Sequence, residues 1–221
     1  MNVNDVYRIM RFIARKNQLE SLSPSEFQDA FNSAQRNYYD FLVGRIEQYR
    51  YDKAVPRVGI AMTDNVMSRL TPFQLSATPA VASGSANKPA DFNKLLSMLT
   101  ASNNRIQRVE ENRLAERLND SIDPASETNA FYVEKPTAWS IYPSTIASIK
   151  VNYLKVPNNV VWGYNLDGLG RPVYSPGTST DPLWYDNDID EIIARACKIL
   201  GISIKENALV SYGQSVINTG E

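Results

Sequence analysis

The chain has 221 residues, of which 43% are hydrophobic, so it is long enough to bury one large core or two smaller ones. Its 23 basic and 24 acidic residues leave a net charge of -1, so the chain as a whole has no electrostatic attraction to nucleic acid. Histidine is absent, which removes the commonest general base, the Ser-His and Cys-His nucleophile pairs and the commonest zinc ligand. The composition therefore indicates a folded protein and excludes many classes of enzyme.

The first 50 residues predict two helices. Apolar residues at helical spacing predict the first over about residues 4 to 18. A capping box begins the second, with Ser23 as N-cap, Pro24 in the first turn and Glu26 three residues after the cap. One apolar face then continues to about residue 50. The first apolar stripe consists of Val6, Ile9, Met10 and Ile13, and the second of Phe27, Phe31, Ala34, Tyr38, Phe41, Leu42, Ile46 and Tyr49.

The next segment is rich in proline and small residues. Residues 71–90 show neither helical nor strand periodicity, so we predict a long surface loop or an extended arm. Residues 91–99 predict a short helix, although a buried strand fits them almost as well. We expect a strand at 105–110 with its apolar face at Ile106, and then a short charged helix at 111–118.

From Phe131 onward, short runs of β-branched and aromatic residues predict an antiparallel meander. We interpret VNYLKVPNNVVWGY, residues 151–164, as a hairpin that turns at Pro157-Asn158-Asn159 and whose aromatic side chains stabilise cross-strand pairs. The expected strands cover residues 131–134, 138–142, 148–156, 160–164 and 171–174.

Two helices are expected at the end of the chain. The first is capped at Asn187 or Asp188 and ends at Gly201, and the second covers residues 205–217. The fold class is therefore α+β, with an N-terminal helical hairpin whose second helix is long, a central antiparallel β-meander and a C-terminal helix pair. We divide it into an N-terminal helical region (1–60), an extended arm (61–103) and the meander with the C-terminal helices (104–221), which forms one compact unit with the N-terminal helices.

Few side chains point to chemistry. The acidic run at 186–191 departs from a calcium loop, because Glu191 and Cys197 occupy the positions of its glycine and glutamate. Cys197 is the only cysteine and lies in an apolar helical pattern, so we expect a buried structural thiol. Trp184 lies near several aspartates, as in a sugar-cleaving site, but packing of the next helix explains it better. We expect no cofactor, no metal, no signal peptide and no membrane span.

Several strand and turn motifs carry a family resemblance. They are Ile141-Tyr142-Pro143, the run from Ile149 to Pro157, Val161-Trp162-Gly163-Tyr164, Gly170-Arg171-Pro172-Val173-Tyr174 and the helix from Ile192 to Gly201. By these motifs the chain resembles virion structural proteins of tailed phages that infect gut Bacteroidetes, including the crAss-like group. The resemblance covers residues 131–210 clearly, and it reaches the N-terminal helices and Leu70-Thr71-Pro72-Phe73 more loosely.

The resemblance implies a non-enzymatic subunit of the ring or connector, an adaptor or stopper, between portal and tail. Its implied partners are copies of itself in a ring, 12-fold if the ring adjoins the portal, the portal and neighbouring tail proteins. Genome DNA would pass through without sequence-specific binding, no membrane would be involved, and the protein would reside in the virion after assembly in the host cytoplasm. We expect the oligomer interface at Arg36, Arg45, Arg50, Phe73, Leu75 and Val81.

Two other classes of function stay open. Trp162, Trp184 and the tyrosines could form a carbohydrate-binding or tail-associated glycan-degrading module. The basic first helix, with Arg8, Arg11 and Arg15, could instead belong to a host-takeover or DNA-packaging accessory protein.

Overall fold

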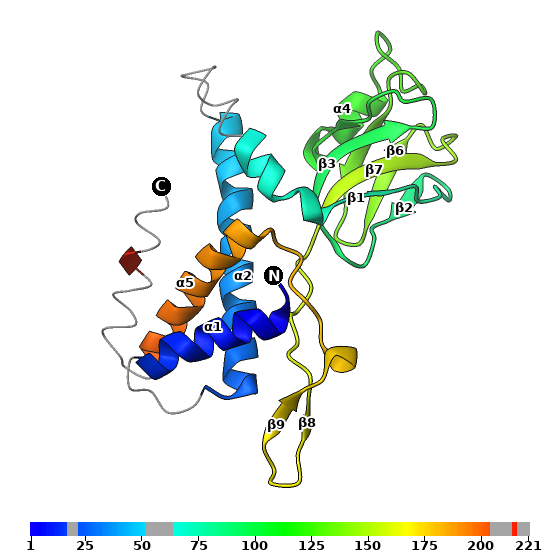
Figure 1. Ribbon diagram of the computed structural model, residues 1–221. Helices are drawn as coiled ribbons and strands as arrows, with labels where there is room; N and C mark the ends of the chain where they lie inside the picture. The colour runs from blue at the N-terminus through cyan, green and yellow to red at the C-terminus, as the bar shows by residue number, and fades with distance from the viewer. Residues whose placement is uncertain (17–21, 52–63, 204–213, 216–221) are drawn as a thin grey trace. The chain divides into compact units, whose positions relative to one another are not determined.

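The computed structural model describes residues 1–16, 22–51, 64–203 and 214–215 (Figure 1). Two compact units are present: residues 1–72 together with 157–221 form a helical unit, and residues 73–156 form a β unit. The β unit is thus an insertion between two parts of the helical unit. The predicted α+β class is confirmed, with a helix pair at the N-terminus, antiparallel sheets in the middle and a helix near the C-terminus.

Three long helices are present in the described part of the helical unit. They are α1 (Val3–Lys16), α2 (Pro24–Tyr51) and α5 (Asp186–Ser203), and a short helix covers residues 64–69. The predicted capping box begins α2: the Glu26 N–H donates to Ser23 Oγ at 3.3 Å, and the Ser23 N–H donates to Glu26 Oε2 at 2.9 Å. The hydrogen bonds from Ser23 lower the pKa of Glu26 below its ordinary value. Helix α2 packs along α5, and α1 contacts both.

The helix faces differ in detail from the predicted ones. The buried face of α1 consists of Val3, Val6, Tyr7, Met10 and Ala14. Ile9 was expected on this face and is instead 37% exposed, because the α1 helix is oriented so that Tyr7 faces the core. Helix α5 buries Ile189, Ile192 and Ile193 and continues two residues past Gly201. Most of the second predicted C-terminal helix, at 205–217, lies outside the described residues.

The β unit is a sandwich of two sheets. One sheet has the order β1-β7-β3 and the other the order β2-β6-β5-β4, and all pairs are antiparallel except β4 with β5. Trp139 and Ile141 from one sheet meet Met98 and Val151 from the other in the apolar core between them. The bounds are β1 Gln74–Ala77, β2 Ser85–Asn87, β3 Phe92–Thr100, β4 Gln107–Arg108, β5 Phe131–Glu134, β6 Ala138–Tyr142 and β7 Ile149–Lys155, with the short helix α4 at Leu114–Leu118.

The structure corrects two predictions in the β unit. Residues 91–99 do not form the predicted helix, and the alternative of a strand is confirmed: from Phe92 onward they lie in β3, where Leu95 pairs with Tyr153 of β7. Residues 71–90 are not an extended arm, because β1 and β2 add to opposite sheets. In both cases pairing with a strand distant in the sequence determines the local structure, and this overrides local propensity.

The predicted hairpin over residues 151–164 is wrong. Strand β7 pairs with β1 on one side and β3 on the other, so its neighbour in the sequence has no free edge to join. The chain leaves the β unit after Val156, and Val161 forms only an isolated bridge with Thr180. The separate hairpin that follows is formed by β8 (Tyr164–Leu166) and β9 (Pro172–Tyr174) in the helical unit.

Candidate functional site

Trp162 lies at the base of the β8–β9 hairpin and anchors it to helix α1. Its ring centroid lies 4.5 Å from that of Tyr7, 5.8 Å from Tyr164 and 5.7 Å from Tyr174. The indole N–H donates to Asn4 Oδ1 at 3.1 Å. The side chain is only 5% exposed, so this aromatic cluster is a packing contact and offers no open ring face to a ligand.

Polar side chains of α2 hold the extended segment 158–162 that leads into the hairpin. Asn32 makes two hydrogen bonds with the backbone of Val160: its Nδ2 donates to the carbonyl oxygen at 3.0 Å, and its Oδ1 accepts from the N–H at 2.7 Å. One turn further along the helix, Gln35 Nε2 donates to the carbonyl oxygen of Asn158 at 2.9 Å. Together with the bridge between Val161 and Thr180, these amides give the backbone of the segment hydrogen-bond partners outside the named strands.

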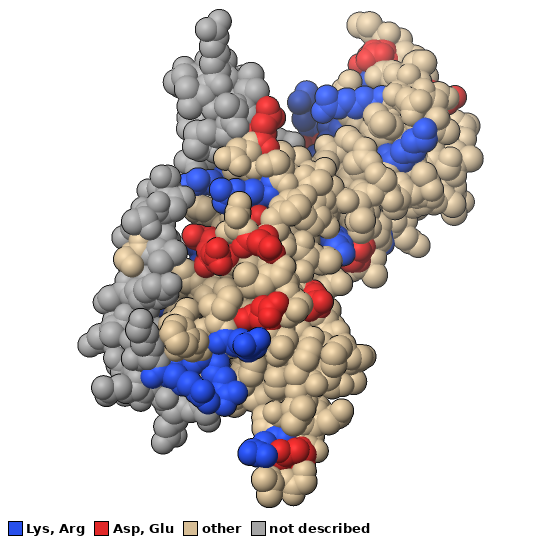
Figure 2. Space-filling view, viewed as in Figure 1, with Lys and Arg blue, Asp and Glu red and all other residues tan. Residues whose placement is uncertain are grey.

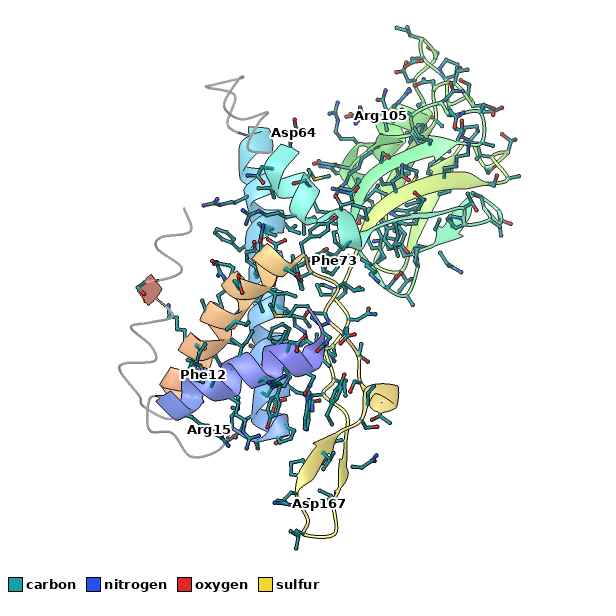
Figure 3. The ribbon with its side chains drawn as sticks, viewed as in Figure 1. Phe12, Arg15, Asp64, Phe73, Arg105 and Asp167 are labelled. Carbon is teal, nitrogen blue, oxygen red and sulfur yellow. The ribbon has the colours of Figure 1, made fainter. Side chains whose placement is uncertain are left out.

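Asp167 organises the turn of the hairpin. Its Oδ1 accepts from the N–H groups of Leu169 and Arg171 at 2.9 and 2.8 Å, and its Oδ2 accepts from Arg171 Nε at 2.9 Å. The backbone hydrogen bond from Arg171 is the largest cause that lowers the pKa of Asp167. Gly170 adopts a φ of +74°, a conformation that glycine adopts without strain. The turn is therefore well defined although it is exposed (Figure 3).

The hairpin presents apolar side chains to solvent. Leu166 is 66% exposed and Leu169 is 77% exposed, and Val173 is also exposed. The only charged residues between 163 and 175 are Asp167 and Arg171, which neutralise each other. Figure 2 accordingly shows one basic and one acidic patch side by side on an otherwise uncharged hairpin. An exposed apolar surface on a rigid base is typical of an interaction site, so the hairpin is the candidate functional site.

A buried polar network joins α2, α5 and the helix of residues 64–69. The Tyr38 hydroxyl donates to Asp188 Oδ1 at 2.8 Å and accepts from Arg69 Nη1 at 2.9 Å. Arg69 also lies 3.5 Å from Asp188, whose side chain is 3% exposed. Burial raises the pKa of Tyr38 to about 12 and raises the pKa of Asp188 above its ordinary value. All three groups have partners within the network, which ties the three helices together.

The predicted interface residues occupy both units. In the helical unit, Arg36 donates to Asn159 Oδ1 at 2.7 Å, Arg45 lies over the ring of Phe41, and Arg50 is located near the end of α2. In the β unit, Phe73 is buried, Leu75 is partly exposed on β1, and Val81 packs against the core. The structure does not gather the six residues on one element. The exposed leucines of the hairpin were not predicted, although Asp167-Gly168 between two aromatic strands is a hairpin signal.

The residues considered for sugar chemistry have structural roles. Trp184 is 4% exposed and donates through Nε1 to Gln35 Oε1 at 3.3 Å. Asp181 accepts from the N–H of Val3 at 2.7 Å, Asp186 pairs with the amino group of Met1, and Asp188 belongs to the buried network. The observation that favoured a carbohydrate site is therefore explained by packing and hydrogen bonding.

Other functional groups are buried or dispersed. Burial raises the pKa of Cys197 to about 12, so this thiol is protonated at neutral pH, in agreement with the predicted structural role. Among the described residues, no group of three or more Cys, Asp or Glu side chains could hold a metal ion. No helix in the described part of the chain has the length and apolar character needed to cross a membrane.

Comparison with known proteins adds no family to this description. No family model matches the chain, and no curated protein has a matching sequence.

Proposed function

We propose that the chain is a non-enzymatic virion structural protein of a tailed phage, a subunit of the ring or connector between portal and tail. The observation that carries the proposal is the β8–β9 hairpin, a firmly anchored element with exposed leucines at its tip. An enzyme positions charged or nucleophilic groups around a substrate, whereas this element positions an apolar, electrically neutral surface. Such a surface suits contact with another protein.

The family motifs support the same proposal and give it its context. They lie on β6, β7, β9 and α5, and therefore describe strands and turns that build the two units. A ring subunit needs rigid units and complementary surfaces at different places, because cyclic assemblies repeat one head-to-tail contact. The near-zero net charge is compatible with a conduit through which genome DNA slides without sticking.

The proposed partners are further copies of the chain, the portal and neighbouring tail proteins. A ring adjoining the portal would be 12-fold, and neither sequence-specific DNA binding nor a membrane is part of the proposal. Native mass spectrometry of the purified protein, alone and mixed with portal, tests it by detecting ring-sized species. Failure to form or join a ring, together with absence of the chain from purified virions, would overturn the proposal.

A further inference from the structure

Three arginines lie on one side of helix α1. Arg8, Arg11 and Arg15 follow one another at spacings of three and four residues, which places them on the same face of the helix. Arg8 and Arg15 are exposed, and Arg11 is half-buried. We call these three residues the arginine face; Figure 2 shows basic side chains gathered over α1, and Figure 3 labels Arg15. The opposite side of the helix, with Val6 and Met10, is buried in the core.

The arginine face is not matched by acidic side chains. Among the described residues, no carboxylate forms an ion pair or a hydrogen bond with it. The Nε of Arg11 is buried and has no hydrogen-bond partner in the described structure. By contrast, Arg69, Arg171 and Arg195 of the same unit each pair with a carboxylate. Like charges three and four residues apart destabilise a helix, so an anion bound to this face would relieve their repulsion.

Two carboxylates lie near the arginine face and leave it with an excess of positive charge. Asp5 precedes Arg8 by one turn of α1. Glu26 and two of the arginines act on the hydroxyl of Tyr7, and the carboxylate of Glu26 accepts hydrogen bonds from Ser23. Residues 1–16 contain four basic side chains and one acidic one, so an excess of two positive charges is left when Glu26 is counted as well.

A second copy of the chain offers few free negative charges to this face. The start of α5 is rich in acidic residues, but three of the four there already have partners within the molecule. These are Asp186, which pairs with the amino group of Met1, Asp188, which lies near Arg69, and Glu191, which pairs with Arg195. Only Asp190 is left. The anion that fits the arginine face must therefore come from another molecule.

Duplex DNA matches the arginine face in length and in charge. Between Arg8 and Arg15 the axis of α1 advances about 10 Å, at about 1.5 Å per residue. One strand of DNA carries a phosphate every ~3.4 Å along the duplex axis, so about three phosphates lie over the same length. A guanidinium group binds a phosphate through two parallel N–H···O hydrogen bonds. Three arginines thus face about three phosphates.

We propose that the arginine face of α1 binds the phosphates of duplex DNA without reading the base sequence. The proposal deepens the ring function, on which it rests, by naming the surface that meets the genome. Contacts with about three phosphates give an association constant that falls steeply as salt is added. Binding is therefore weak at physiological salt, which suits a duplex that has to slide past the protein.

Fluorescence anisotropy of a labelled DNA duplex tests the proposal. A plot of the logarithm of the association constant against the logarithm of salt concentration should have a slope of about -2.7, so affinity should fall about 40-fold between ~50 and ~200 mM salt. Arg8→Gln combined with Arg15→Gln should reduce the slope to about -0.9. Arg8→Lys combined with Arg15→Lys keeps both charges and should keep the slope. Both side chains are exposed, so neither double variant disturbs the core.

Arg105→Gln combined with Lys150→Gln is the matched control, because it removes the same number of charges from exposed residues of the β unit. Its slope should stay close to that of the wild type. Equal losses of slope in the two glutamine variants would overturn the proposal, since net charge and not the arginine face would then determine binding. No binding at ~50 mM salt, or a strong preference between duplexes of unrelated sequence, would also overturn it.

Further outcomes separate the arginine face from the ring and from other sources of phosphate. Salt-dependent DNA binding by a chain that forms no rings would support the arginine face, although the ring proposal would fail. Rings that do not bind DNA at low salt would leave the ring proposal standing and overturn the DNA contact. Vesicles that contain phosphatidylserine give the last comparison. Binding to these vesicles and not to DNA would identify an anionic lipid as the partner and overturn the proposal.

Discussion

The two units of the molecule are stabilised in different ways. The β unit has backbone ladders in both sheets and a continuous apolar core between them. The helical unit adds to its helix packing a set of side-chain hydrogen bonds, in which α2 holds an extended segment that lies outside the named strands. Loss of apolar volume should therefore damage the β unit most, and loss of a hydrogen-bonding side chain should damage the helical unit most.

Trp139 gives the largest expected effect, in the β unit. Its side chain is fully buried in the core between the sheets, with its ring 5.2 Å from that of Phe92. Trp139→Ala leaves a large cavity and should lower the free energy of unfolding by about 3–5 kcal/mol. Hydrogen exchange followed by mass spectrometry should show faster exchange in β5, β6 and β7, and little change in α2.

Trp139→Phe is the matched control. The indole N–H is buried and has no hydrogen-bond partner in the described structure, so phenylalanine removes volume without breaking a bond. Trp139→Phe should lower the free energy of unfolding clearly less than Trp139→Ala does. An equal loss for the two variants would show that ring packing is not what stabilises the β unit.

Asp188 gives the next largest effect, in the helical unit. Asp188→Ala leaves the buried hydroxyl of Tyr38 without its acceptor, which should cost about 1–3 kcal/mol. Asp188→Asn keeps a hydrogen-bond acceptor at this position, so it should lower the free energy of unfolding less than Asp188→Ala does. Urea unfolding monitored by circular dichroism compares the two variants, and a greater loss for asparagine would contradict the assigned hydrogen bond.

The same pair of proteins gives a dependence on pH. Burial raises the pKa of Asp188 above its ordinary value of 3.8, against the opposing effects of Tyr38 and Arg69. The folded protein therefore binds this proton more tightly than the unfolded chain, so the stabilisation is present below 3.8 and is lost as the pH rises through the raised pKa. The stability of wild type relative to Asp188→Asn should fall across that range and then stay constant. A rise in this relative stability with pH would mean that the attraction to Arg69 outweighs burial in shifting the pKa of Asp188.

Asn32 tests the side-chain hydrogen bonds of the helical unit with a smaller expected effect. Asn32→Ala removes both hydrogen bonds to the backbone of Val160 and should cost about 1–2 kcal/mol. The amide of Val160 should exchange much faster, because the Asn32 side chain is its acceptor. Arg36→Ala, one turn further along the same helix, removes an exposed contact to Asn159 and should change stability by less than about 0.5 kcal/mol.

The difference between the two units also shows which structural features could be predicted from the sequence. The capping box of Ser23 and Glu26 was predicted because its partners are three residues apart, and β5 and β6 were predicted with the observed bounds because their pattern is local. The strands that pair with β7 were not predicted. Alternation of apolar and polar residues indicates which face of a strand is buried, but it does not indicate which strand lies beside it. The bond from Asn32 to Val160 spans 128 residues, and no local pattern marks it. The turn at Asp167 could be predicted as a break because its signal is local. The exposure of Leu166 and Leu169 could not be predicted, because it depends on the tertiary structure.

The hairpin turn gives the smallest effect, because it concerns an exposed segment at the edge of the helical unit. Asp167→Asn weakens the acceptor for the N–H groups of Leu169 and Arg171, so these amides should exchange faster while global stability stays nearly unchanged. In the wild type, donors from Arg171 lower the pKa of Asp167 below 3.8. The turn is therefore stabilised above the ordinary pKa and loses this support as the pH falls through the lowered pKa. The NMR shift of the Arg171 amide should titrate with a midpoint below 3.8, and a midpoint at or above that value would show that the turn does not depend on the carboxylate.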